Sequence, residues 1–128
     1  MNRMKLTIAS VTSSRFLSHI RFLEANLSML IIDTPQTDQR LQPGSTLTIL
    51  FKETDVALAR TLTPSTLGHI DVVVENIEQG EVLNEVHLSS RLGSLTALVP
   101  LFDVSVGEKL YALIHPAHIL LAKDSHGE

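Results

Sequence analysis

The sequence has no cysteine, so thiolate chemistry and thiolate metal sites are excluded. The side chains considered first for catalysis or metal binding are its six histidines, its serines and its glutamates. His115 and His118 are closely spaced, but Pro116 lies between them and favours a turn over one face of a helix. A zinc site needs three or four converging ligands, and the pair has no evident third. The other histidines fall in expected strands or in the polar tail, and include His19, His69, His87 and His126. We therefore expect no zinc site.

Serines and glutamates give no catalytic pattern either. Ser13-Ser14 and Ser89-Ser90 lie in expected turns, and no base that could activate a hydroxyl adjoins them. An acidic surface around one expected hairpin consists of Glu75, Glu78, Glu81 and Glu85. These residues do not have the spacing of a calcium-binding loop. We therefore expect a binding protein and not an enzyme.

Charge and composition exclude several classes of partner. The chain has a net charge of −4, and isolated basic residues such as Arg15, Arg21 and Arg40 form no basic face for phosphates. Four phenylalanines and one tyrosine are few for the stacking platforms of a single-strand binder. No apolar run is long enough for a signal peptide or a membrane span. We expect a soluble, cytoplasmic protein that neither binds nucleic acid nor inserts into a membrane.

Short β-forming runs separated by turn residues extend along the whole chain, and predict an all-β barrel or sandwich. The expected strands are Lys5–Val11, His19–Leu23, Leu27–Ile32, Thr46–Lys52, Val56–Ala59, His69–Val74, Glu81–Leu88, Leu95–Val99, Lys109–Ile114 and Ile119–Ala122. Short helical turns are possible at three places: Glu24–Leu30, Thr37–Leu41 and Leu101–Val104.

An internal repeat is the strongest feature of the pattern. Residues 44–60 align without a gap on residues 107–123, which matches Gly44 with Gly107 and Val56 with Ile119. The upstream strands follow in the same order after a shift of register. We predict two modules, residues 1–62 and 63–124, followed by a frayed tail at 125–128. A module of about 60 residues has little core of its own, so each copy is expected to share surface with its twin or with a second chain.

The residues 41–59, with Pro43-Gly44, a strand, and then Lys52 and Thr54-Asp55-Val56, closely resemble the closing segment of Mop/TOBE molybdate-binding modules. The second half resembles one too, and the resemblance covers nearly the whole chain as a tandem pair. It implies two OB-like five-stranded barrels. Such pairs occur at the C-terminus of molybdate importer ATPases, in molybdate-responsive regulators and as free-standing storage proteins.

The resemblance also implies an oxyanion site. Family members supply a lysine at a strand end, the next backbone amide, and a serine-x-arginine-asparagine segment from a neighbouring module. Lys52 and the amide of Glu53 match the first part, and Ser65 and Thr66 match the serine segment. The arginine and asparagine are missing, since Leu67 and Gly68 stand there, or Gly68 and His69 in the neighbouring register. His115 occupies the second lysine position.

Molybdate or tungstate binding by a homodimer, as a regulatory or storage module of molybdate transport and homeostasis, is therefore the expected function. The alternative is a ligand-free dimerisation and regulatory domain of an ABC-transporter ATPase, which the missing arginine would favour.

Overall fold

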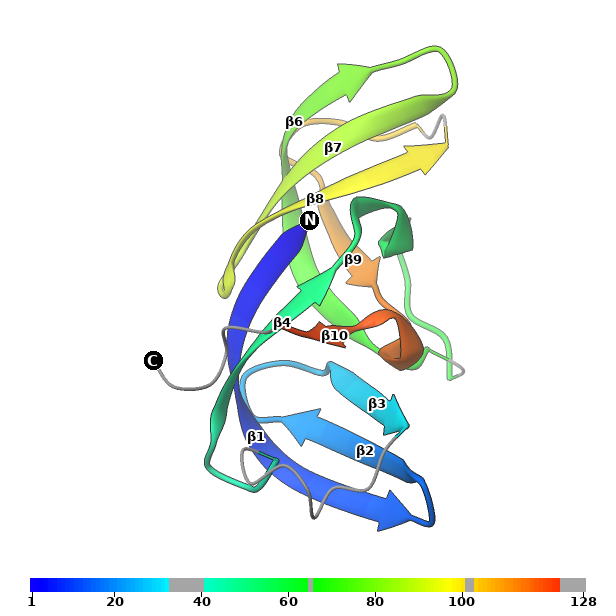
Figure 1. The fold of residues 1–128 in the computed structure, drawn as a ribbon. Helices are drawn as coiled ribbons and strands as arrows, with labels where there is room; N and C mark the ends of the chain where they lie inside the picture. Colours follow the sequence, from blue (N-terminus) through cyan, green and yellow to red (C-terminus); the bar gives the residue numbers. More distant parts are fainter. Residues whose placement is uncertain (33–40, 65, 101–102, 123–128) are drawn as a thin grey trace.

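The computed structural model describes residues 1–32, 41–64, 66–100 and 103–122, and it folds into two five-stranded antiparallel sheets (Figure 1). All ten expected strands are present. The first sheet has the order β10-β4-β1-β2-β3, with β1 Asn2–Ser14, β2 Leu17–Phe22, β3 Ser28–Ile32, β4 Thr46–Phe51 and β10 Leu120–Leu121. The second has the order β5-β9-β6-β7-β8, with β5 Ala57–Ala59, β6 His69–Gln79, β7 Leu83–Ser90, β8 Gly93–Pro100 and β9 Lys109–Leu113.

Alternation of apolar and polar residues places each sheet around a core. In β1, Met4, Leu6 and Ile8 are buried, while Lys5 between them is exposed. This period of two puts every second side chain on one face of the strand. Buried side chains of both sheets form one continuous hydrophobic cluster. The all-β fold of two curled five-stranded modules therefore agrees with the prediction.

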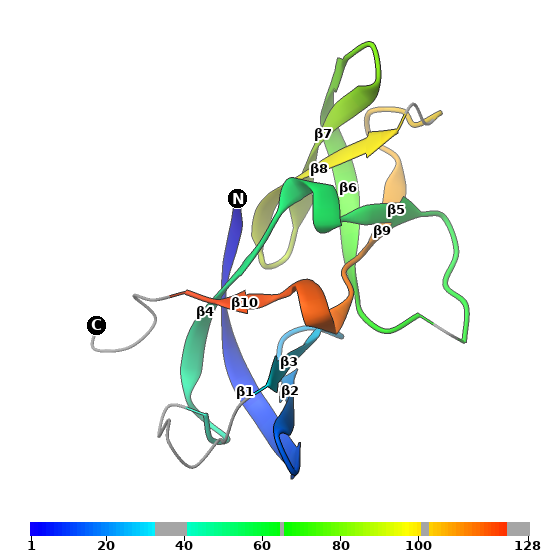
Figure 2. The same ribbon diagram turned by 45° about the vertical axis from the view of Figure 1, so that its right-hand side comes forward.

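The closing strands are exchanged between the two sheets. β5 follows β4 in the sequence but pairs with β9 of the second sheet. β10 follows β9 but pairs with β4 of the first sheet. Figure 2 shows both crossings, with β10 lying across β4 and β5 beside β9. Each half of the chain therefore supplies one strand to the sheet of the other half.

The turn before β4 and the turn before β9 are built alike. Gly44 has φ of 91° and Gly107 has φ of 88°, a left-handed conformation that favours glycine. The amide of Gly44 donates to the Ile8 carbonyl at 2.9 Å, and the amide of Gly107 donates to the Val74 carbonyl at 2.7 Å. These matching bonds agree with the repeat, including its register shift. The separation along the sequence between Ile8 and Val74 is three residues greater than the separation between the two glycines.

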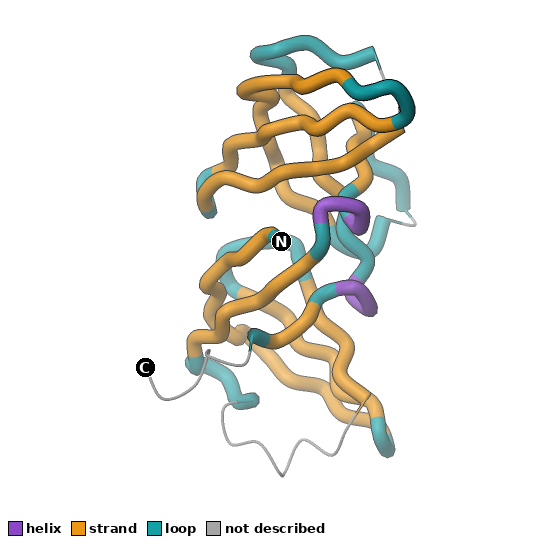
Figure 3. Tube along the Cα trace, turned by 45° about the horizontal axis from the view of Figure 1, so that its top comes forward, coloured by secondary structure: helices purple, strands orange, loops and turns teal. Residues whose placement is uncertain are grey.

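A short 3₁₀ turn links each repeat's last long strand to its exchanged strand. These turns are η2 (Glu53–Asp55) and η3 (Pro116–His118). They lie close together where the two sheets meet, and His118 Nδ1 is 3.6 Å from Asp55 Oδ1 (Figure 3, purple). Asp55 and His118 occupy equivalent positions in the aligned repeats. The pseudo-twofold axis that relates the two halves therefore passes between these turns.

The expected helical turns have different outcomes. The one expected at Glu24–Leu30 is wrong, because the chain bends at Glu24 and pairs as strand from Ser28. The turn at Thr37–Leu41 lies almost wholly outside the described residues, and Leu101–Val104 lies partly outside them. Among the described residues, no helix has the length and apolar character to cross a membrane.

Candidate anion-binding site

Two equivalent junctions arise where a strand-end turn meets the segment that leads into a repeat. At the first junction, Phe51 at the end of β4 pairs with Asn2 at the start of β1. At the second, the Ile114 amide after β9 donates to the Gly68 carbonyl before β6 at 3.2 Å. A Cβ on Gly68 would lie 2.8 Å from the Ile114 oxygen, so this close approach requires glycine.

The first junction holds Lys52 and Glu53. Lys52 is exposed and immediately precedes η2. The turn uses the amides of Asp55 and Val56 as donors, so the amides of Glu53 and Thr54 are not needed inside it. The Glu53 carboxylate binds the N-terminal ammonium of Met1 at 2.6 Å, and this hydrogen bond lowers the pKa of Glu53. The first junction thus holds a lysine and two amides that the turn does not use, with a carboxylate beside them.

The second junction lacks these donors. His115 stands at the position of Lys52, and Pro116, which has no N–H, stands at the position of Glu53. The next amide, of Ala117, donates to His115 Nδ1 at 3.0 Å. The Ala117 amide of η3 is therefore already engaged. The turn at η3 has fewer free hydrogen-bond donors for an anion than the turn at η2 has.

Thr66 belongs to the second junction and not to the first. Its hydroxyl accepts the amide of Thr63 at 3.1 Å, and its own amide donates to the Thr63 carbonyl at 3.0 Å. Ser65 lies outside the described residues. Thr66 lines one cleft together with Gly68 and Pro116 of the second junction, and Lys52 is not among the described residues that line it. One chain therefore does not bring Lys52 and Thr66 together.

A cleft of about 820 Å³ opens at the second junction, between the outer face of β1, β2 and β3 and the segment that leads into β6. Among the described residues that line it there is no aspartate or glutamate. Its polar lining comprises one arginine, two histidines, three hydroxyls and one amide: Arg21, His19, His69, Ser10, Ser28, Thr66 and Asn26. Such a lining offers donors and positive charge without a carboxylate, which suits an anion.

Sequence reasoning placed Thr66 in a binding segment but treated Arg21 as an isolated basic residue that belongs to no basic face. Arg21 lies on β2, and Thr66 follows three complete strands later, so spacing along the chain gives no hint that they share a cleft. The one available signal is alternation, which puts His19 and Arg21 on the same outward face of β2.

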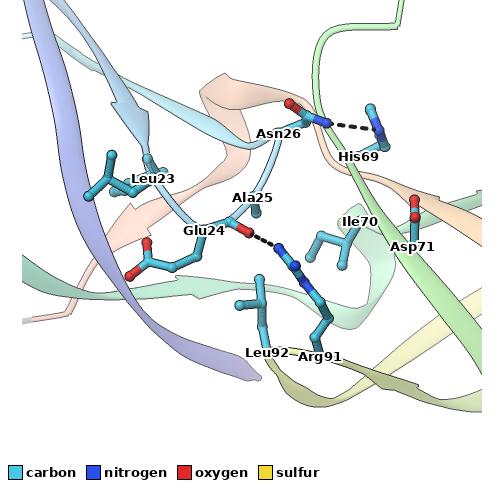
Figure 4. A pocket seen from close by; sticks show the side chains of 10 residues that line it. Leu23, Glu24, Ala25, Asn26, His69, Ile70, Asp71, Arg91 and Leu92 are labelled. Carbon is cyan, nitrogen blue, oxygen red and sulfur yellow. Dashed lines mark hydrogen bonds between the residues drawn. The ribbon is translucent and has the colours of Figure 1, made fainter.

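An adjoining pocket of about 430 Å³ continues from this cleft past Asn26 and His69 (Figure 4). Arg91 donates to the Glu24 carbonyl at 2.8 Å, and Asn26 lies 3.3 Å from His69 Nε2. The Glu24 carboxylate accepts from the amide and hydroxyl of Thr7 at 2.8 and 2.7 Å. Burial acts to raise the pKa of Glu24, but these bonds lower it overall. Its charge is thus engaged away from Arg91.

Among the described residues, His115 and His118 do not belong to a group of three potential metal ligands within mutual reach. The His115 and His118 rings lie 5.5 Å apart, and the neighbouring carboxylate of His118 is that of Asp55. The one group of three metal-type ligands within mutual reach, in the part of the chain that the structure describes, is Glu78, Glu85 and His87 on the β6–β7 hairpin.

No protein-family model matches the chain, and no curated protein matches its sequence. Among solved structures, the cytoplasmic molybdate-binding protein ModG, crystallised with molybdate bound, matches with a TM-score of 0.83 over 94% of both chains. The chain shares the fold of ModG. At 20% sequence identity, this likeness establishes the fold alone.

Proposed function

We propose that the protein binds a tetrahedral oxyanion, molybdate or tungstate, and acts without catalysis. The observation that carries the proposal is the cleft at the second junction, whose described lining residues include no carboxylate, in a fold shared with a molybdate-binding protein. Donors and cations are what a dianion requires, and carboxylates nearby would repel it.

The proposed ligands are Lys52, the amide of Glu53, Ser65 and Thr66. Because Lys52 and Thr66 lie at different junctions of one chain, they can share an anion only across two copies. A homodimer in which Lys52 of one copy reaches the Thr66 cleft of the other would unite them. The turn at η2 supports this role, since it has a lysine and two amides not used inside the turn.

We infer that the protein is a cytoplasmic regulatory or storage module of molybdate transport and homeostasis. Attachment to an ATPase domain of a molybdate transporter is part of this proposal. The competing function is a dimerisation and regulatory domain that has lost its ligand, which the absence of an arginine at Leu67 and Gly68 favours.

Calorimetric titration with molybdate, tungstate and sulfate at low salt distinguishes oxyanion binding from the ligand-free dimerisation function. We expect saturable binding of molybdate or tungstate, and Lys52→Ala should weaken it about 10- to 100-fold, because one charge-assisted bond contributes about 1.5–3 kcal/mol. Lys5→Ala, which removes an exposed charge of β1 outside the cleft lining, is the matched control. No heat for any anion at millimolar concentration would favour the dimerisation function.

A further inference from the structure

Arg21 lies on the outward face of β2, near the end of that strand in the first sheet. It pairs across the strands with Ser10 of β1 and Ser28 of β3, and all three line the cleft. His19 follows on the same face, two residues away along β2. A guanidinium in this position is flanked by hydroxyls on both sides and faces the segment of Thr66.

The guanidinium of Arg21 has no ion pair or hydrogen bond among the described residues. Two other arginines of the structure are engaged: Arg60 binds Glu108 at 2.6 Å, and Arg91 donates to the Glu24 carbonyl. Arg21 thus keeps its full set of N–H donors available. Its planar fork matches two oxygens of an oxyanion at once, which a lysine cannot do.

The equivalent face of the second repeat has the opposite character. His87 replaces Arg21, since it pairs with Asn76 and Thr96 as Arg21 pairs with Ser10 and Ser28. Glu85 replaces His19 and Glu78 replaces Thr12, and both carboxylates contact His87, at 2.9 and 3.2 Å. An anion on this face would meet two glutamates, so the two repeats cannot bind anions alike.

We propose that Arg21 supplies the guanidinium that the segment 65–68 lacks, and that each chain has one oxyanion site, in the cleft of Arg21 and Thr66. This inference rests on the proposed function and deepens it. It assigns the missing positive charge to a strand of the other repeat, which the fold brings to that segment.

Titration of the intact protein with molybdate, comparing Arg21→Ala with the control Lys5→Ala, tests the proposal. We expect one anion per chain, affinity about 10- to 100-fold weaker in Arg21→Ala, and little change in Lys5→Ala. A second variant, His19→Glu with Arg21→His, gives the first face the residues that correspond to Glu85 and His87 of the second and should abolish binding. Both substituted residues lie on an outward strand face, and circular dichroism checks that the variants fold.

The outcomes separate the two proposals. If the unmodified chain binds molybdate and Arg21→Ala binds within about twofold of it, the assignment of Arg21 is wrong while the proposed function stands. Two anions per chain would also overturn the inference. If the unmodified chain binds no oxyanion, the proposed function itself fails, and the inference fails with it.

Discussion

Asn2 joins the two repeats through a pair of hydrogen bonds. Its side-chain amide donates to the Thr96 carbonyl at 2.9 Å, and its Oδ1 accepts the Thr96 amide at 2.8 Å. The residue is only 7% exposed, so neither bond is readily replaced by water. A side chain at the start of β1 therefore anchors the first sheet to β8 of the second.

Replacing Asn2 with alanine should lower the free energy of unfolding by about 1–3 kcal/mol, because both backbone groups of Thr96 lose a buried partner. Urea unfolding measures the loss, with Lys5→Ala as the exposed control on the same strand. A loss as small as that of the control would show that Asn2 does not link the repeats.

Glu78, Glu85 and His87 form a charge cluster on the outer face of the β6–β7 hairpin. Glu78 and Glu85 are directly opposite each other across the strands, an arrangement that destabilises like charges. The hydrogen bond to Glu78 and attraction to both carboxylates raise the pKa of His87. Interaction with Glu85 and then with His87 lowers the pKa of Glu78, while interaction with Glu78 raises the pKa of Glu85. The protonated histidine thus compensates the two carboxylates.

Stability conferred by His87 should depend on pH. Because its pKa is raised in the folded state, its contribution is fully present below the unfolded value of about 6.5 and is lost as pH rises through the folded value. We expect His87→Gln to be more destabilising at pH 5.5 than at pH 8.5, as measured by urea unfolding. An equal effect at both pH values would contradict this explanation.

At the scale of elements, the exchanged strands are the feature that holds the repeats together. β5 and β10 are short, and each is preceded by a buried residue, Val56 or Ile119, that is 2% exposed. These anchors are equivalent in the repeat, so burial of both follows from the same turn geometry. Loss of an anchor should loosen the exchange itself.

Ile119→Ala should destabilise the protein by about 2–5 kcal/mol, since it removes a fully packed side chain and leaves a cavity. Leu120→Ala is the matched control, because Leu120 is 48% exposed and its replacement should cost far less. Thermal or urea unfolding measures both. Equal losses in the two variants would argue against an anchoring role for Ile119.

The sequence was sufficient to predict the strands and the repeated turn, but not their connections. Alternation located β2, and a glycine with a following strand located the turns at Gly44 and Gly107, because these are local properties. Which sheet a closing strand joins depends on contacts between distant residues, so the exchange was not foreseen. Arg21 was missed for the same reason, because β6 and its leading segment reach it only through the fold.

At the scale of the whole molecule, the exchange makes the two halves interdependent. Each sheet contains a strand from the other half, and the hydrophobic cluster runs through both. The predicted boundary between residues 1–62 and 63–124 therefore separates repeats in sequence without separating two independent sheets. This arrangement predicts that the chain unfolds as one unit.

We expect a single cooperative unfolding transition, with the same midpoint whether followed by circular dichroism or by the fluorescence of Tyr111 in β9. Residues 1–62 or 63–124 alone should lack stable structure, because each lacks the strand that the other supplies. Two separate transitions, or a folded isolated half, would contradict this interdependence.

The most direct test of the Arg21 site is a crystal structure of the protein with tungstate, whose anomalous scattering locates the anion without ambiguity. We predict one tungstate per chain in the cleft, within hydrogen-bonding distance of the Arg21 guanidinium and the segment of Thr66. Tungstate bound on the face of Glu78, Glu85 and His87, or absent from the cleft at saturating concentration, would contradict this prediction.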